Sequence, residues 1–205
     1  MKDLSNLNEM HLDVLKEIGS IGSGNAATSL AKMLNKRVRM FAPAVKWVEF
    51  KDITGFIGGP DNTVAGILVF MSGEINGMVV FLLTMESAQT IVKVITDGMY
   101  ADRANASFNE IERSALTEIG NILINAYVGS LAGFTHTRIV PTVPYLCIDM
   151  ANAILSVPAI EFGKVANKAL LIESSFSVED QSMAGYFVLV PDMPSFTRIM
   201  HELGI

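Results

Sequence analysis

The sequence repeats itself after 101 positions, the distance from Asp13 to Ser114, and this duplication limits the folds that the chain can form. The segment DVLKEIGSIGSGNAATSLA, which starts at Asp13, aligns with SALTEIGNILINAYVGSLA, which starts at Ser114. The identical pairs are Leu15/Leu116, Glu17/Glu118, Ile18/Ile119, Gly19/Gly120, Ile21/Ile122, Ser29/Ser130, Leu30/Leu131, Ala31/Ala132, Arg37/Arg138 and Pro43/Pro144. A duplicated unit of this size predicts two similar halves that share one core.

Each copy predicts the same series of elements: a long helix, an extended segment that contains proline, a hairpin and a second helix. Apolar residues recur at helical spacing along the first long helix, and its predicted inner face consists of Leu12, Leu15, Ile18, Ile21 and Leu30. Asn109 is expected to cap the second long helix. The predicted helices cover 8–34, 86–96, 109–133 and 194–203, and the predicted hairpins cover 64–84 and 168–190.

Neither half is large enough to enclose a core with its own helices and hairpin. The two copies are therefore expected to merge into one sheet around a pseudo-twofold axis, and we predict the α+β fold class. The expected organisation is a single domain made of two repeats, at about 8–100 and 107–205.

Composition and charge argue against several classes of protein. Hydrophobic residues make up 50% of the 205 residues and charged residues 18%, so a folded core is expected rather than disorder. A net charge of −6 opposes nucleic-acid binding, because neutralising phosphates requires a concentrated basic surface. Cys147 is the only cysteine, so no intrachain disulfide can form and a cytoplasmic location is expected.

The most membrane-like segment, at 64–84, is long enough to span a bilayer, but its centre reads Gly73, Glu74, Asn76 and Gly77. β-branched and aromatic residues fill the apolar runs on both sides of these turn residues, which favours two antiparallel strands. The N-terminal residues are acidic and polar where a signal peptide needs an apolar stretch. We therefore expect no export and no membrane insertion.

A polar stripe follows the outer side of each long helix. At about 100° per residue, Glu17 lies about 40° round the helix from Asp13, and Ser20 lies about 20° to the other side. The same angles in the second helix are occupied by Ser114, Glu118 and Asn121. The apolar residues of each helix lie well round the cylinder, so both stripes are predicted to face away from the core.

Glu110 and Asn125 extend the second stripe by one turn at each end. A proline follows each stripe 23 positions after its last residue, at Pro43 and Pro144. A single glutamate and amide at this spacing on an exposed helix face usually serve solvation alone. The recurrence of the glutamate and the proline in both copies favours a functional surface.

The pattern Ser114-x3-Glu118-x2-Asn121-x22-Pro144 resembles the signature of the CheC, CheX and FliY family of chemotaxis phosphatases. The likeness covers nearly the whole chain, including the duplication. The resemblance implies hydrolysis of the aspartyl phosphate of CheY-P, a phosphorylated response regulator. In that reaction Glu118 would grip the regulator, and Asn121 would enter its active site and place the attacking water.

The pattern Asp13-x3-Glu17-x2-Ser20-x22-Pro43 resembles a first copy of the same signature. The resemblance implies a second catalytic site at Glu17 and Ser20. This copy departs from the family pattern at Ser20, where the family has asparagine. A serine hydroxyl can contact water but reaches less far than a carboxamide.

The implied chemistry explains why so few residues suffice. An aspartyl phosphate is already a reactive acyl phosphate, and the receiver domain supplies its own Mg²⁺ and lysine, so a helper need only position water. A carboxamide can accept from that water and donate nearby without a charge that repels phosphate. Glu118, as an anion, suits pairing with a lysine of the partner. No nucleophile or cofactor of this chain's own is expected.

Two further features of the sequence have structural rather than catalytic explanations. The stretch GSIGSGNAAT lacks the preceding strand and the GK[ST] ending of a phosphate-binding loop, and its small residues predict close packing against the other long helix. The three histidines, at His11, His136 and His201, have no carboxylate or cysteine at ligand spacing. No metal site is therefore predicted in this chain, and the Mg²⁺ is expected in the partner.

The segment that follows Pro144 has two interpretations. Asp149, Met150 and Asn152 resemble the stretch that docks the receptor deamidase CheD in CheC-type proteins. The other interpretation is a buried connecting helix capped by Asp149. Two alternative functions also remain open, a non-catalytic flagellar switch module similar to the middle domain of FliM or FliY, and an adaptor that chiefly binds CheD.

Overall fold

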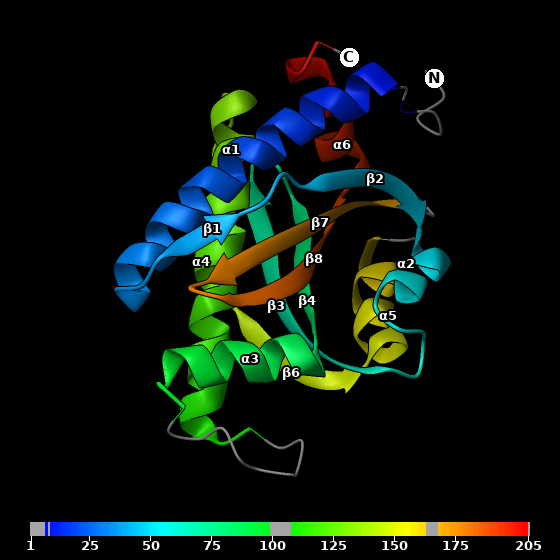
Figure 1. Ribbon diagram of the computed structural model, residues 1–205. Helices are drawn as coiled ribbons and strands as arrows, with labels where there is room; N and C mark the ends of the chain where they lie inside the picture. The colour runs from blue at the N-terminus through cyan, green and yellow to red at the C-terminus, as the bar shows by residue number, and fades with distance from the viewer. Residues whose placement is uncertain (1–6, 8, 99–107, 163–167, 205) are drawn as a thin grey trace.

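The computed structural model describes residues 7, 9–98, 108–162 and 168–204 (Figure 1). The helices are α1 (Glu9–Leu34), α2 (Phe50–Phe56), α3 (Met85–Ile95), α4 (Glu110–Phe134), α5 (Ala151–Phe162) and α6 (Met193–Glu202). The strands are β1 (Val38–Met40), β2 (Ala44–Glu49), β3 (Thr63–Gly73), β4 (Gly77–Thr84), β5 (Ile139–Pro141), β6 (Tyr145–Met150), β7 (Lys168–Val178) and β8 (Gln181–Pro191).

The predicted helices and hairpins are confirmed, with ends that differ by one or two residues. Asn109 caps α4 as predicted, and it forms a capping box with Glu112. The Asn109 side chain accepts from the Glu112 backbone N–H at 3.0 Å, and the Asn109 N–H donates to the Glu112 carboxylate at 2.6 Å. Glu112 is buried, so this exchange also gives its side chain a hydrogen-bond partner inside the protein.

The two hairpins join into one antiparallel sheet, as the repeat predicted. Strand β4 pairs with β8, which gives the order β1-β7-β8-β4-β3-β5 along the main path of the sheet. Strand β2 pairs with β7, and β6 pairs with β3. The α+β class with one merged sheet is therefore confirmed.

The halves also exchange their extended segments, which the sequence did not predict. Strands β1 and β2 of the first half pair with β7 of the second, and β5 and β6 of the second half pair with β3 of the first. At each exchange, a backbone hydrogen bond links the turn of one hairpin to the residue just before the short strand of the other half. The Glu74 N–H donates to the Arg138 carbonyl and the Glu179 N–H to the Arg37 carbonyl, both at 2.9 Å. Each half therefore completes the sheet of the other.

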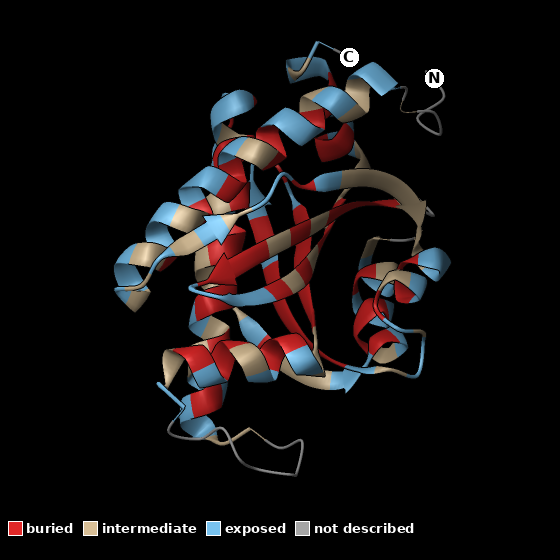
Figure 2. Ribbon diagram, in the orientation of Figure 1, coloured by how far each residue is buried: buried red, intermediate tan, exposed pale blue. Residues whose placement is uncertain are grey.

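Helices cover both faces of the sheet unequally. Buried residues of α1, α3, α4 and α6 pack with one face into the larger core, and residues of α2 and α5 pack with the other face into a smaller core. Figure 2 shows that α1 and α4 are buried along one side only, with exposed residues along the other. The motif helices thus lie on the same face of the sheet, with their polar sides outward.

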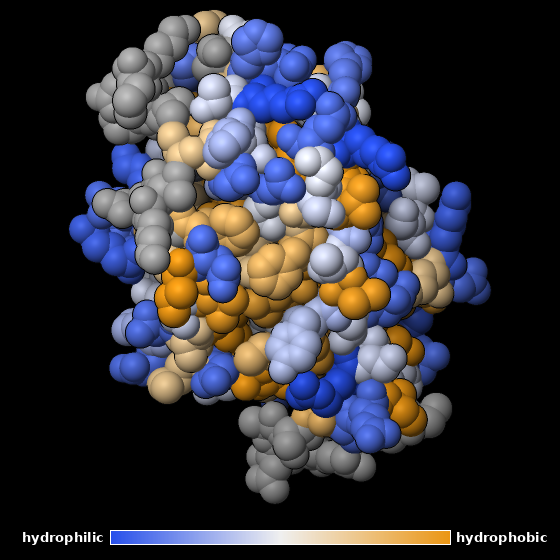
Figure 3. Space-filling model, turned by 180° about the vertical axis from the view of Figure 1, so that it is seen from behind, coloured by the Kyte–Doolittle hydropathy of each residue, from blue (hydrophilic) through white to orange (hydrophobic). Residues whose placement is uncertain are grey.

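Some apolar surface remains uncovered. Figure 3 shows apolar side chains gathered over the middle of the molecule when it is viewed from behind. The large apolar side chains that are exposed include Phe70 of β3, Val140 of β5 and Tyr145 of β6. No helix within the described residues is long and apolar enough to cross a membrane.

The packing of α4 on the sheet gives a first testable prediction. A Cβ at Gly120 would lie 2.7 Å from Ile67 Cγ1 and 2.9 Å from Ile67 Cβ. Gly120→Ala should therefore lower the free energy of unfolding, measured by urea denaturation, by about 1–3 kcal/mol. Gly129→Ala on the same helix is the matched control, because no described atom beyond its chain neighbours and its own helix backbone would lie within 4 Å of its Cβ. The control should gain up to about 1 kcal/mol from helix propensity, and an equal gain in both variants would contradict this packing.

Candidate functional site

The second polar stripe lies on the outer side of α4, as the helical angles predicted. Ser114 and Glu118 are exposed and Asn121 is half-buried, whereas Leu116 and Ile119 of the same turns are buried in the core. A helix holds residues three and four positions apart on one side, so Glu118 and Asn121 are presented together. The stripe is accessible to a partner protein without any rearrangement of the sheet.

Asn125 holds the carboxamide of Asn121. The Asn125 side-chain NH₂ donates to Asn121 Oδ1 at 2.7 Å and to the Asn121 backbone carbonyl at 2.8 Å. This bond orients the Asn121 side chain and leaves its NH₂ group and one oxygen lone pair for another molecule. Sequence reasoning placed Asn125 on the stripe but did not identify this contact, although two amides at i and i+4 on one helix face are the signal for it.

The first stripe differs from the second in its polar groups. Asp13 and Glu17 are exposed on α1, and Ser20 is half-buried. The Ser20 hydroxyl donates to the Lys16 backbone carbonyl of its own helix at 2.9 Å. The position related to Asn125 is Gly24, which has no side chain. The first copy therefore presents a carboxylate but no oriented amide.

The two motif prolines lie in the extended segments. Pro43 is buried just before β2, and a Cβ at Gly19 would lie 3.1 Å from Pro43 Cγ. The proline ring thus packs beneath the turn of α1 that carries Glu17. Pro144 is half-buried just before β6. Pro43 therefore belongs to the supporting structure of the first stripe.

The two motif helices cross at their small residues, which confirms the packing predicted for the glycine-rich stretch. A Cβ at Gly22 would lie 3.2 Å from the Cα of Tyr127, so α1 and α4 approach closely there. The Tyr127 hydroxyl is hydrogen-bonded to the Ser23 hydroxyl at 2.7 Å and donates to the Ser174 hydroxyl of β7 at 2.9 Å. This buried network connects both motif helices to the sheet, and burial raises the pKa of Tyr127.

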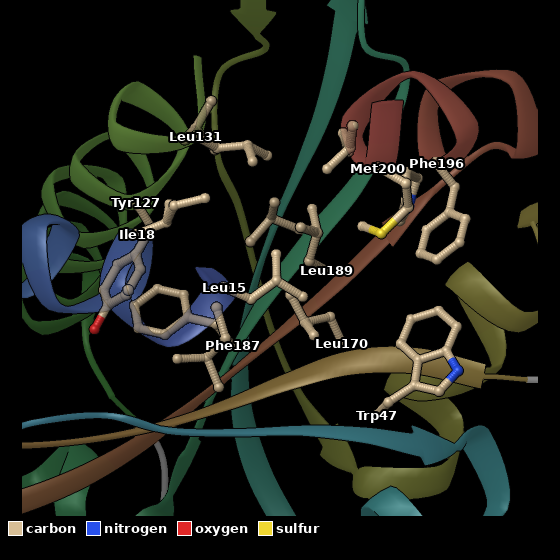
Figure 4. Close-up of a pocket in the computed structure, with 16 residues that line it drawn as sticks. Leu15, Ile18, Trp47, Tyr127, Leu131, Leu170, Phe187, Leu189, Phe196 and Met200 are labelled. Atoms are coloured by element: carbon tan, nitrogen blue, oxygen red, sulfur yellow. The ribbon is translucent and has the colours of Figure 1, made fainter. Parts of the chain in front are cut away.

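An apolar cavity of about 50 Å³ lies beneath α1 (Figure 4). Leu15 and Ile18 of α1 line it together with Phe196 and Met200 of α6. Trp47 stacks on Phe196 with ring centroids 5.1 Å apart, and its Nε1 is buried without a hydrogen-bond partner among the described residues. The described lining contains no carboxylate, amine or imidazole. The Tyr127 hydroxyl of the lining is engaged by Ser23 and Ser174, so the polar stripes are the better candidate for the functional site.

Two expectations from the sequence are wrong. Ile21 was predicted on the inner face of the first helix, but 39% of it is exposed, because it lies at the edge of the apolar face near the crossing with α4. Asp149 does not cap a helix. It lies in strand β6 opposite Val64, and its carboxylate accepts from the N–H of Met150 at 2.7 Å. The following helix α5 is only partly buried, and Asn152 is exposed on it.

The sequence predicted that the three histidines form no metal site in this chain. Within the described part of the chain, no three His, Cys, Asp or Glu side chains are grouped so that they could hold a metal ion. The placement of Mg²⁺ in a partner stays a prediction.

Comparison with known proteins identifies proteins that are similar in sequence and in fold. A model of the CheC-like family matches residues 10–46. The CheY-P phosphatase CheC of Bacillus subtilis is 29% identical over 206 residues, which cover 100% of this chain and 99% of that protein. The crystal structure of Thermotoga maritima FliY has a TM-score of 0.75 at 19% identity, covering 97% of this chain and 98% of that chain.

A third relative was crystallised with a partner. The CheX–CheY complex of Borrelia burgdorferi with BeF3 and Mg²⁺ contains a chain that matches with a TM-score of 0.51 at 18% identity. The match covers 83% of this chain and 96% of that chain. The structural matches show a shared fold, and together with the full-length sequence match they confirm the resemblance that the motif indicated. The chain is thus similar in sequence to the CheC-like family at residues 10–46, and along its full length to a CheC protein.

The helix crossing gives a second prediction. Tyr127→Phe should lower the free energy of unfolding by about 1–3 kcal/mol, because two buried serine hydroxyls would lose their partner. Tyr145→Phe is the matched control, since 69% of Tyr145 is exposed, and it should stay within about 0.5 kcal/mol of the wild type. Chemical denaturation measures both. Equal stability of the two variants would mean that the Tyr127 network does not stabilise the crossing.

Proposed function

We propose that this chain hydrolyses the aspartyl phosphate of phosphorylated CheY, and that the stripe on α4 carries most of the activity. The observation that carries the proposal is the pair of exposed Glu118 and half-buried Asn121, one turn apart, with the Asn121 carboxamide oriented by Asn125. The full-length relative in Bacillus subtilis is named as a CheY-P phosphatase, which supports the substrate.

The reaction requires water and a positioned partner. The water oxygen bonds to phosphorus while the bond between phosphorus and the aspartate oxygen breaks, which yields inorganic phosphate and the free carboxylate. The receiver domain supplies the metal ion and the basic group that neutralise the phosphoryl charge. The contribution of this chain is to place one water in line with the breaking bond, which raises the effective concentration of the nucleophile.

Asn121 suits the placement of that water. Its remaining oxygen lone pair can accept from the water, and its NH₂ can donate to an acceptor next to the phosphoryl group. The hydrogen bond from Asn125 already restricts the Asn121 carboxamide, so less side-chain entropy is lost when the partner docks. Asn125 therefore acts through Asn121 as a positioning residue.

Glu118 suits docking rather than proton transfer. It is exposed, and no ion pair involving it occurs among the described residues. An unengaged carboxylate one turn before Asn121 can pair with a lysine of the receiver domain and set its register on α4. The CheX–CheY complex, whose CheX fold is similar, supports CheY as the partner.

The two alternative functions have less support. The similarity to the FliY structure shows a shared fold. If this chain were a non-catalytic switch module, it would bind a receiver domain without accelerating the loss of its phosphate. CheD docking at Asp149, Met150 and Asn152 is compatible with phosphatase activity. These residues lie at the junction of β6 and α5, and α5 packs on the sheet face opposite to the motif helices.

The third prediction tests the proposed function. Wild-type protein at catalytic stoichiometry should accelerate the decay of CheY that has been phosphorylated with a small-molecule donor. Asn121→Ala should lower the rate by about 10²–10³, by analogy with the loss of one positioned polar group in other enzymes. Gln89→Ala, at an exposed position of α3, is the control and should keep the wild-type rate. If the wild type fails to accelerate the decay, the proposed function is wrong.

The fourth prediction concerns the first stripe, which lacks both amides of the second. In the Asn121→Ala background, Ser20→Asn should restore part of the activity, and Ser20→Asn with Gly24→Asn should restore more. Gly24 tolerates a side chain, because no described atom outside its own helix backbone lies within 4 Å of an added Cβ. The measurement is again CheY-P decay. A well-folded variant with both substitutions that stays inactive would show that the first stripe lacks more than its amides.

A further inference from the structure

Four large apolar side chains are exposed at related positions of the two motif helices. Exposed fractions are 68% for Met10 and 59% for Ile111, which the repeat aligns in the first turn of each helix. They are 40% for Met33 and 38% for Phe134, which the repeat aligns in the last turn. A single exposed apolar residue is normal on a protein surface. The recurrence of both exposed positions in both copies indicates a shared use.

Two of these four side chains, Met33 and Ile111, border a groove at the start of α4. The groove has a volume of about 540 Å³ and lies between the last turn of α1, the end of α3 and the first turns of α4. Met33 and Ile111 contribute apolar walls, and Ser114 and Glu118 of the motif line the same groove. The groove is therefore continuous with the stripe assigned to docking.

The charges of the groove are mostly negative. Glu110 and Glu118 line it, and neither forms an ion pair within the described residues. The lysine of the groove, Lys36, is already engaged, because it forms an ion pair with Asp97 and donates to the Val94 carbonyl at 3.0 Å. The surface thus combines apolar contacts with two carboxylates, which favours a partner that presents an apolar side chain beside a basic one.

We propose that this groove receives the phosphorylated receiver domain, and that Ile111 and Met33 are apolar anchors that determine its affinity and position on α4. The inference rests on the proposed function and extends it, because the anchors lie outside the Glu118 and Asn121 motif. We assign the receiver domain to the groove because Glu118 lines it, so a partner that pairs with Glu118 also covers the groove. Burial of the anchors on docking supplies affinity, and the carboxylates supply orientation.

The experiment separates docking from chemistry. Decay of CheY-P is measured over a range of CheY-P concentrations for the wild type, Ile111→Ser and Met33→Ser. Because an isoleucine buried on docking contributes about tenfold to affinity, Ile111→Ser should raise KM about tenfold and leave kcat within about twofold. Ile111→Leu should restore the wild-type KM. Ile160→Ser on α5, where 68% of Ile160 is exposed, is the matched control and should not change KM.

A binding measurement without turnover completes the test. CheY loaded with Mg²⁺ and BeF3 is titrated with each variant, and fluorescence anisotropy should report the same loss of affinity for Ile111→Ser and Met33→Ser. If the wild type accelerates decay while both serine variants keep its KM and affinity, the groove proposal is overturned and the proposed function stands. A fall in kcat at unchanged KM would also overturn it, because the anchors would then act on the chemistry. If the wild type binds but does not accelerate decay, the proposed function fails instead.

Discussion

The antiparallel pairing of β4 with β8 is the interaction on which the rest of the structure depends. It joins the two hairpins across the pseudo-twofold axis, where the rings of Phe81 and Phe187 stack with centroids 4.5 Å apart. The exchanged strands then add to this common sheet, so the edge strands of each half pair, within the described residues, only with the hairpin of the other. Neither half can unfold without removing strands from its partner, and the two are therefore expected to unfold cooperatively.

The sheet in turn determines where the motif helices present their polar residues. Both α1 and α4 pack on one face, and their crossing at Gly22 and Tyr127 leaves each stripe facing outward. A helix fixes Glu118 and Asn121 one turn apart more rigidly than a loop would. Rigidity matters here because the proposed reaction needs no nucleophile from this chain. Its rate depends on the accuracy with which one carboxamide is placed.

The sequence predicted the local features well and the long-range features poorly. Helical spacing of Leu15, Ile18 and Leu30 and the turn residues of the hairpins were sufficient to predict the elements, and Asn109 was identified as a cap. The strand exchange was not predictable, because short extended segments such as β1 and β5 carry no signal for which hairpin they join. For the same reason the pairing of Asp149 within β6 was missed, and the candidate site residues rest on the motif alone.

The two copies of the motif share the residues proposed for docking and differ in the residues proposed for placing water. The glutamate, the proline and the exposed apolar residue of the first turn recur in both copies, as Glu17, Pro43 and Met10 in the first. The amides do not recur, because Ser20 bonds to its own helix and Gly24 has no side chain. Drift in an unused copy would affect both groups of residues alike. The first copy instead keeps the groups that we propose hold a receiver domain and lacks those that we propose place water, so the proposal assigns binding and turnover to different residues.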